Sequence, residues 1–271
     1  MDNVRNQRSE DTLPGRFERT SSLTFILYFI ALAFVVWSFT GAGWSFSALG
    51  QGVPAMLDFL SRAWPPSTDR LAAVGLSILE TFQMALVGTL VGIVLSLPLA
   101  ILGAKGLTGS RSLYFLSRSI VALFRTVPDL VWALIFVITV GLGPFAGTLA
   151  IMVDTIGFCG RFFAEAMEDV DKAPSEALVA TGAKRLDAIF AAVIPAAMPA
   201  FITTSLFALE KATRSSVILG LVGAGGVGIE LKVAMDFFDY PLAMSIIVMI
   251  FALVLAVERL GVWARKKIIE G

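Results

Sequence analysis

The chain has 271 residues with a formal net charge of zero, and 57% of its residues are hydrophobic while only 15% are charged. This composition excludes a soluble globular domain and offers no basic surface for nucleic acid. The single cysteine, Cys159, excludes a disulfide framework, and the lack of histidine argues against a membrane-embedded metal enzyme.

Six stretches are expected to cross a membrane, since a spanning α-helix needs about 20 mostly apolar residues. Five charge-free runs lie, in chain order, at 21–57 (divided at 41–43), 81–104, 130–153, 188–209 and 240–257. A sixth helix is expected near 145–163, where Asp154 interrupts the apolar sequence. The sequence therefore predicts an all-α integral membrane protein with six transmembrane helices. Little length remains for an extramembrane domain, and the phosphate-binding sequence G-x-x-x-x-G-K-S/T is absent.

The lysines and arginines predict the orientation, because cytoplasmic flanks of membrane helices carry the excess. They gather in the tail at 1–22, after the second span, in a loop at about 165–195 and in a basic tail at 264–271, while the turn at 141–144 has none. Both termini and the 165–195 loop are therefore expected in the cytoplasm. The apolar run at 23–42 is expected to be an uncleaved anchor helix, since no small-x-small cleavage pattern follows it.

An external connector is expected at 43–70, before a permeation core at 71–263. It mixes tryptophan, phenylalanine and leucine with a few charges and ends at Pro65 and Pro66. Enrichment in tryptophan is typical of a helix that lies in the membrane interface. A plain hydrophobic connector fits equally and is the interpretation that we favour.

Arg125 and Pro128 mark the start of the third span. Pro128 is expected to kink the helix, because proline removes a backbone donor and clashes with the preceding turn. Arg125 lies one turn earlier, where its side chain can reach the cytoplasmic surface. The pair is a candidate gate or hinge, and simple packing would explain it equally well.

A polar, helix-forming segment at 175–182 separates two apolar runs. Glu176 and Ala177 begin it, Gly182 ends it, and Pro195 follows about a dozen residues later. An ordinary amphipathic connector would fit this description. The spacing also resembles the EAA loop of ABC-importer permeases, although Leu178 occupies a position where alanine is usual. The resemblance implies a short coupling helix that docks on a separate ATPase, and glycine suits the tight turn after it.

Charged residues inside the membrane are costly, so they tend to face a polar interior or a partner. Glu210 and Arg214 are spaced i and i+4 and can pair on one helix face, whereas Lys211 points about 100° away from Glu210. Arg214 could meet a passing oxyanion with two parallel hydrogen bonds, or the pair could be structural. Asp154 is a further candidate for the pathway, and a structural role is favoured there.

The run at 223–228 satisfies G-x-G-x-x-G through Gly223, Gly225 and Gly228, with Gly226 between them. A dinucleotide site would need a preceding strand inside a βαβ unit, and no such pattern exists in the chain. We expect close backbone packing or a re-entrant turn instead. The four glycines are therefore candidates for a gate or hinge and not for cofactor binding.

Three segments together are similar to those of phosphonate-type permeases, the PhnE family: RTVPDLVW at 125–132, GLGPFAG at 141–147 and GLVGAGG at 220–226. The acidic-x-x-x-Arg spacing of Glu210 and Arg214 belongs to the same resemblance, which covers about 71–263. This chain departs from the family pattern at Ala212, where asparagine is common, and at Asp154, where histidine is common.

The resemblance implies a type I ABC-importer permease of the MetI-like fold in a bacterial inner membrane, surrounded by membrane lipid. Its implied partners are a dimer of ATPase subunits that carry ATP and Mg²⁺, a second permease copy or paralogue, and an external solute-binding protein. No cofactor is expected on this chain. The implied substrate is a phosphonate or a related phosphorus oxyanion such as phosphite or phosphate, and a methionine-type or betaine-type importer is the alternative.

Two other classes remain as competitors. An ion-coupled secondary transporter would need no ATPase and predicts internal repeats with broken helices, and no convincing repeat is visible. A membrane-embedded enzyme of phosphorus or lipid metabolism is disfavoured, because the chain lacks histidine and any cluster of metal ligands.

Overall fold

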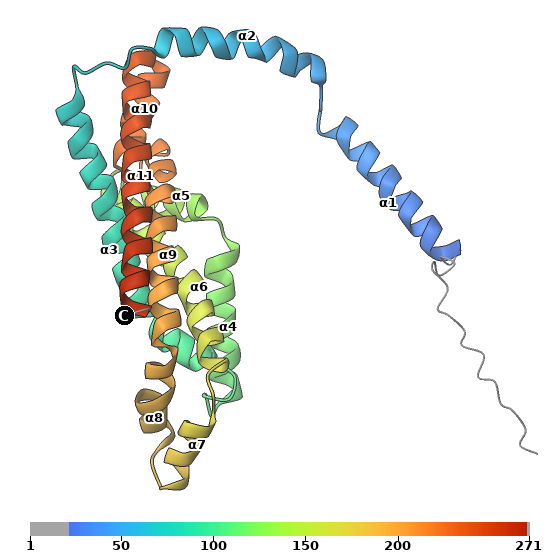
Figure 1. Cartoon of the computed structure of the whole chain (residues 1–271), viewed down its shortest axis with the longest axis vertical. Coiled ribbons are helices and arrows are strands. Elements are labelled where there is room, and N and C mark those ends of the chain that lie inside the picture. The colour runs from blue at the N-terminus through green and yellow to red at the C-terminus, as the bar shows by residue number, and fades with distance from the viewer. Residues whose placement is uncertain (1–21, 270–271) are drawn as a thin grey trace, which may run out of the picture. The chain divides into compact units, whose positions relative to one another are not determined.

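A computed structural model describes residues 22–269, and every regular element in this part of the chain is a helix (Figure 1). In chain order the elements are α1 (Ser22–Gly41), α2 (Phe46–Ala63), α3 (Leu71–Gly103), α4 (Arg111–Thr126), α5 (Asp129–Val140), α6 (Pro144–Glu168), α7 (Ala173–Ala180), α8 (Arg185–Ala188), a π-helical turn (Ile189–Val193), α9 (Ile194–Leu221), α10 (Val227–Asp236) and α11 (Tyr240–Ile269). The predicted all-α class is confirmed. The predicted tail at 1–22 lies outside the described residues except for its last one, as does the end of the basic tail.

The predicted number of spans agrees with the helices found. Five helical segments are each long and apolar enough to cross a membrane, namely α1, α3, α6, the continuous run Arg185–Leu221 and α11. Helices α4 and α5 make a sixth when counted as one broken span, with a bend of 90° between them. That bend confirms the expected kink at Pro128, which is the N-cap residue directly before α5, while Val127 before it is extended with ψ of 121°.

Contacts divide the chain into two compact units, Met1–Asp58 and Phe59–Gly271. In the first unit, α1 buries none of its side chains against protein. Thirteen of its large apolar residues are more than 45% exposed, in keeping with a helix whose neighbours are lipid. The first unit also holds most of α2, which is a regular helix of 18 residues where only a connector was favoured.

The second unit begins before α3, because the end of the predicted connector packs on the start of α11. The rings of Phe59 and Tyr240 meet edge to face with centroids 5.1 Å apart. The Ser67 amide donates to the Pro241 carbonyl at 3.1 Å. These contacts fix the chain where it enters the bundle of α3 to α11.

Helices α3 and α6 form the centre of this bundle and approach closely through small residues. A Cβ at Gly88 would lie 2.8 Å from Ile151 Cγ2, and a Cβ at Gly92 would lie 2.6 Å from Thr155 Cβ. Small residues four apart on one face are a common way for membrane helices to pack, because they let the backbones meet. Asp154 lies on α6 between Ile151 and Thr155. Helix α9, which carries Glu210, Lys211 and Arg214, also packs on α6.

Candidate functional site

The predicted coupling segment forms a short exposed helix, α7, with a defined end. The Gly182 amide donates to Val179 O at 3.0 Å and the Ala183 amide to Leu178 O at 3.2 Å. These two bonds make a Schellman motif, which needs a residue with positive φ, and Gly182 has φ of +96°. The turn expected at Gly182 is therefore present. Pro195 lies in the first turn of α9, directly after the π-helical turn Ile189–Val193 within the continuous run Arg185–Leu221.

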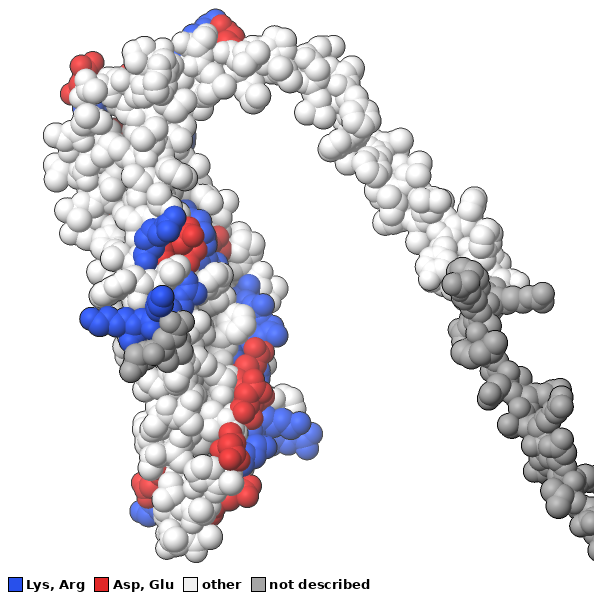
Figure 2. Space-filling model, viewed as in Figure 1, with Lys and Arg blue, Asp and Glu red and all other residues white. Residues whose placement is uncertain are grey.

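The end of the molecule that carries α7 and α8 is rich in charge. Figure 2 shows charged side chains at mid-height and along the lower half of the bundle, toward this end. Helix α7 buries no residue, and Glu176 is exposed and forms no ion pair with another described residue. Beside it lies a hollow of about 690 Å³, whose lining includes Glu176, Val179, Arg185 and Lys105. The segment is therefore exposed, and its coupling role stays a prediction.

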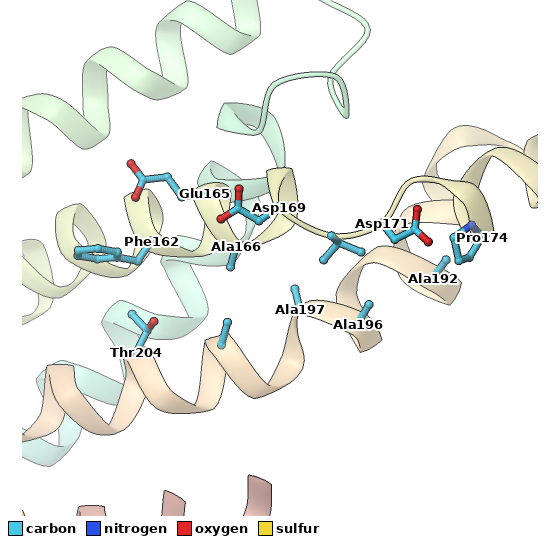
Figure 3. A pocket seen from close by; sticks show the side chains of 12 residues that line it. Phe162, Glu165, Ala166, Asp169, Asp171, Pro174, Ala192, Ala196, Ala197 and Thr204 are labelled. Atoms are coloured by element: carbon cyan, nitrogen blue, oxygen red, sulfur yellow. The ribbon is translucent and has the colours of Figure 1, made fainter. Parts of the chain in front are cut away.

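A second hollow, which we call the acidic hollow, lies between the end of α6 and the start of α9. It has a volume of about 560 Å³ and is lined by Glu165, Asp169 and Asp171 together with several alanines. Figure 3 shows Ala166 of α6 and Ala197 of α9 facing one another, with Glu165 and Asp169 on the far edge of α6. The alanine side chains are too small to fill the space between the two helices.

Four charged side chains on α6 and α9 form two ion pairs. The Lys211 ammonium lies 2.8 Å from both carboxylate oxygens of Asp154, which joins α9 to α6. On the next turn of α9, Arg214 Nη1 lies 3.0 Å from Glu210 Oε1. The expected pairing of Glu210 with Arg214 is present, and the ion-pair partner of Asp154 is Lys211, a contact that the sequence does not predict.

The two cations are more exposed than the acids with which they pair. The Arg214 and Lys211 side chains are 47% and 36% exposed, while those of Glu210 and Asp154 are 13% and 17% exposed. Lys211 also lies over the ring of Phe158, 5.3 Å from its centroid. Each acid is therefore held inside the bundle, and each cation reaches out from it. The pathway role of Glu210, Arg214 and Asp154 stays a prediction.

The glycine-rich run makes a tight turn between α9 and α10. Gly223, Gly225 and Gly226 have φ of +90°, +87° and +73°, which disfavour other residues. A Cβ at Gly228 would lie 2.1 Å from Val217 O. The expected close backbone packing is confirmed, and no strand precedes the run within residues 22–269, so the turn lacks the setting of a dinucleotide site.

This turn ties three parts of the bundle together. The Gly143 amide donates to Gly223 O at 3.0 Å, which joins it to the start of α6. The Gly226 amide donates to Glu80 Oε1 at 3.0 Å, and the Val227 amide donates to Thr81 Oγ1 at 2.7 Å, which joins it to α3. A role for the four glycines as a gate or hinge stays a prediction.

Arg125 lies at the end of α4, just before the 90° bend. Its guanidinium lies over the ring of Phe162 of α6, 5.9 Å from the centroid. Neighbouring backbone packs tightly here, since a Cβ at Gly157 would lie 2.8 Å from the Arg125 amide nitrogen. The tight packing argues for a fixed bend, and the hinge role of Arg125 and Pro128 stays a prediction.

If α7 couples the chain to a separate ATPase, Gly182→Val is expected to reduce ATP-dependent transport about tenfold or more. A β-branched residue is strongly disfavoured at this φ, so the end of α7 would rearrange. A Cβ at Gly182 meets nothing within 4 Å, so the cost is conformational and not a clash. Gly43→Val is the matched control, since Gly43 also has positive φ and open space. Uptake and membrane yield of both variants check the prediction, which fails if Gly182→Val transports normally.

Comparison with known proteins places the chain among transport proteins. A family model described as "Binding-protein-dependent transport system inner membrane component" matches residues 88–269. A putative phosphite transport system permease protein of Stutzerimonas stutzeri is 34% identical over 93% of this chain and 91% of that protein. A phosphate-import permease protein of Mycolicibacterium smegmatis is 36% identical over 83% of this chain, which spans only 41% of that longer protein.

The fold is also shared with solved structures. An inward-facing structure of the MetNI methionine ABC transporter matches with a TM-score of 0.66 and 22% identity, covering 74% of this chain and 98% of that chain. The similarity confirms the predicted MetI-like arrangement of helices. At this identity it carries no information about the substrate.

Proposed function

Because the chain belongs to the family of binding-protein-dependent transport system inner membrane components, we propose that it forms the pathway by which an ATP-driven importer takes up a phosphonate or a related phosphorus oxyanion. The observation that carries the substrate class is the 34% identity, over nearly the whole chain, to a protein named as a phosphite permease. A permease subunit performs no covalent chemistry on what it transports.

The charges on α6 and α9 support an anionic substrate. Arg214 is always protonated, and its planar guanidinium can donate two parallel hydrogen bonds to one oxyanion. Glu210 and Asp154 balance the two cations, so the anion meets local positive charge without a large net charge that would trap it. Fixed cations lower the barrier for an ion that loses part of its hydration between apolar walls.

The coupling to ATP is assigned to α7 and the residues around it. Val179, Leu186 and Phe190 are 50%, 61% and 60% exposed at this end of the molecule. Such apolar side chains beside the exposed Glu176 suit a groove on a separate ATPase. ATP binding, with Mg²⁺ on the ATPase dimer, would move α7 and switch the cavity between two permeases from inward-facing to outward-facing, while an external binding protein supplies the substrate.

The proposed function is tested by reconstitution of the full chain with its ATPase and binding protein in vesicles. ATP-dependent uptake of radiolabelled phosphite, phosphate or a phosphonate supports the proposal. Uptake of methionine or betaine alone would move the chain to another importer class. Uptake driven by an ion gradient without ATP would overturn the ATP-driven mechanism.

The proposed orientation has its own test by cysteine labelling. In a Cys159→Ser background, Ala180→Cys at the end of α7 is expected to react with a membrane-impermeant maleimide only from the cytoplasmic side. Phe237→Cys, at a position that is 79% exposed after α10, is expected to react only from outside. Reversed labelling of both would invert the six-span topology and remove α7 from the ATPase side.

A further inference from the structure

A third hollow, which we call the arginine hollow, lies between α4 and α6 and is not part of the pathway assigned above. It has a volume of about 360 Å³ and is lined by Arg118, Val121, Ala122, Arg125, Thr126, Arg161 and Glu165. Three guanidinium groups and one carboxylate therefore line one small space. None of these residues belongs to the ion pairs of Asp154 with Lys211 or of Glu210 with Arg214.

Two of the three arginines are held in place by acids of α6. Arg118 pairs with Glu168 and also donates from Nε to Gly103 O at 2.7 Å. Arg161 donates from Nε to Glu165 Oε1 at 2.7 Å, one helical turn away. Each guanidinium has five N–H donors in a rigid fork, so both keep donors in reserve after these bonds. The acids fix the forks and leave them able to bind a further acceptor.

Arg125 has a different environment from the other two. It is exposed, and it forms no ion pair with a carboxylate among residues 22–269. The Phe162 ring beneath its guanidinium orients the side chain without neutralising it. Arg118 and Arg161 are each paired with an acid, whereas no acid balances the charge of Arg125. The arginine hollow is therefore positive.

We propose that the arginine hollow binds a phosphate-type oxyanion through Arg125, with Arg118 and Arg161 supplying further donors. A tetrahedral oxyanion offers several acceptor oxygens, and arginine forks are suited to hold it by paired hydrogen bonds. Two sources supply this chemistry: the headgroup of an anionic phospholipid, or free phosphate in solution. Only the free-phosphate source rests on the proposed function, because the arginine hollow would then bind the transported anion after the anion has left the transport pathway.

The experiment measures binding and not uptake, so its failure is separable from failure of the transport proposal. The full chain is placed in nanodiscs of phosphatidylcholine, with or without phosphatidylglycerol, and inorganic phosphate is added to each. Native mass spectrometry counts retained phosphatidylglycerol, and the thermal midpoint reports stabilisation by either ligand. Retention of phosphatidylglycerol supports the lipid source, and stabilisation by phosphate in pure phosphatidylcholine supports the free anion.

The variants decide whether the effect belongs to the arginine hollow. Arg125→Gln is expected to weaken the binding about tenfold or more, since it removes a charge-assisted pair of hydrogen bonds. Arg125→Lys keeps the charge and loses the fork, so it is expected to retain part of the binding if the glutamine variant folds poorly. Arg111→Gln is the matched control, because Arg111 is also on α4 and lies over a ring, that of Phe115, outside the hollow.

Each outcome bears on the proposal. Loss of binding in Arg125→Gln with normal binding in Arg111→Gln supports the arginine hollow as the site. Equal binding by wild type and Arg125→Gln overturns it, as does the absence of any effect of both phosphate and phosphatidylglycerol on the wild-type chain. Equal loss in both variants also overturns it, because the effect would then reflect general surface charge.

Discussion

Lys211→Gln is expected to lower the thermal midpoint of the full chain in detergent and to reduce the yield of folded protein. The change leaves the Asp154 carboxylate, which is 17% exposed, without the ammonium that lies 2.8 Å from both of its oxygens. An exposed pair contributes up to about 1 kcal/mol and loss of a partner from a buried pair costs about 3–5 kcal/mol. Because Lys211 is 36% exposed, we expect an intermediate loss.

The rescue and the control make this prediction specific. Lys211→Gln combined with Asp154→Asn removes the unpaired charge and lets two amides hydrogen-bond, so most of the stability should return. Lys232→Gln removes an exposed lysine of α10 and should leave the midpoint unchanged. A Lys211→Gln variant as stable as wild type would show that Asp154 finds another partner or is protonated, and that the pair does not hold α6 to α9.

Much of the fold was predictable because the signals for it are local. The length of each apolar run fixes the spans, since a helix must satisfy all its backbone groups inside the hydrocarbon. The end of α7 was predictable from Gly182, because a helix that stops in this way needs a residue with positive φ. The bend at Pro128 was expected for the same local reason, although its size of 90° was not.

The partner of Asp154 was not predictable in the same way. The Glu210 and Arg214 pair follows from the i,i+4 spacing on one helix, whereas Lys211 and Asp154 lie 57 residues apart on different helices. Their contact depends on how α6 and α9 are rotated about their axes. The exposure of Arg125 beside Arg161 depends on the packing of α4 against α6 and gave no sequence signal either.

Arg214→Gln is expected to cause a large loss of transport. If Arg214 contacts the passing anion, removal of its charge and fork should reduce uptake about tenfold or more while assembly with the ATPase stays normal. Arg214→Lys should recover only part of the activity, because an ammonium keeps the charge and loses the planar geometry. Arg70→Gln is the matched control, since Arg70 is 50% exposed and pairs with Glu230 at 3.4 Å away from this site.

The double variant Glu210→Gln with Arg214→Gln separates a pathway role from a structural one. A purely structural pair predicts that Arg214→Gln destabilises the protein, since Glu210 is only 13% exposed and would lose its partner. The double neutral variant would then restore both stability and uptake. A pathway role predicts restored stability without restored uptake, because no guanidinium remains to meet the oxyanion. Uptake and thermal midpoint are measured on the wild type, on Arg214→Gln and on the double variant, and together they distinguish the two roles. Full recovery of uptake in the double variant would end the pathway assignment.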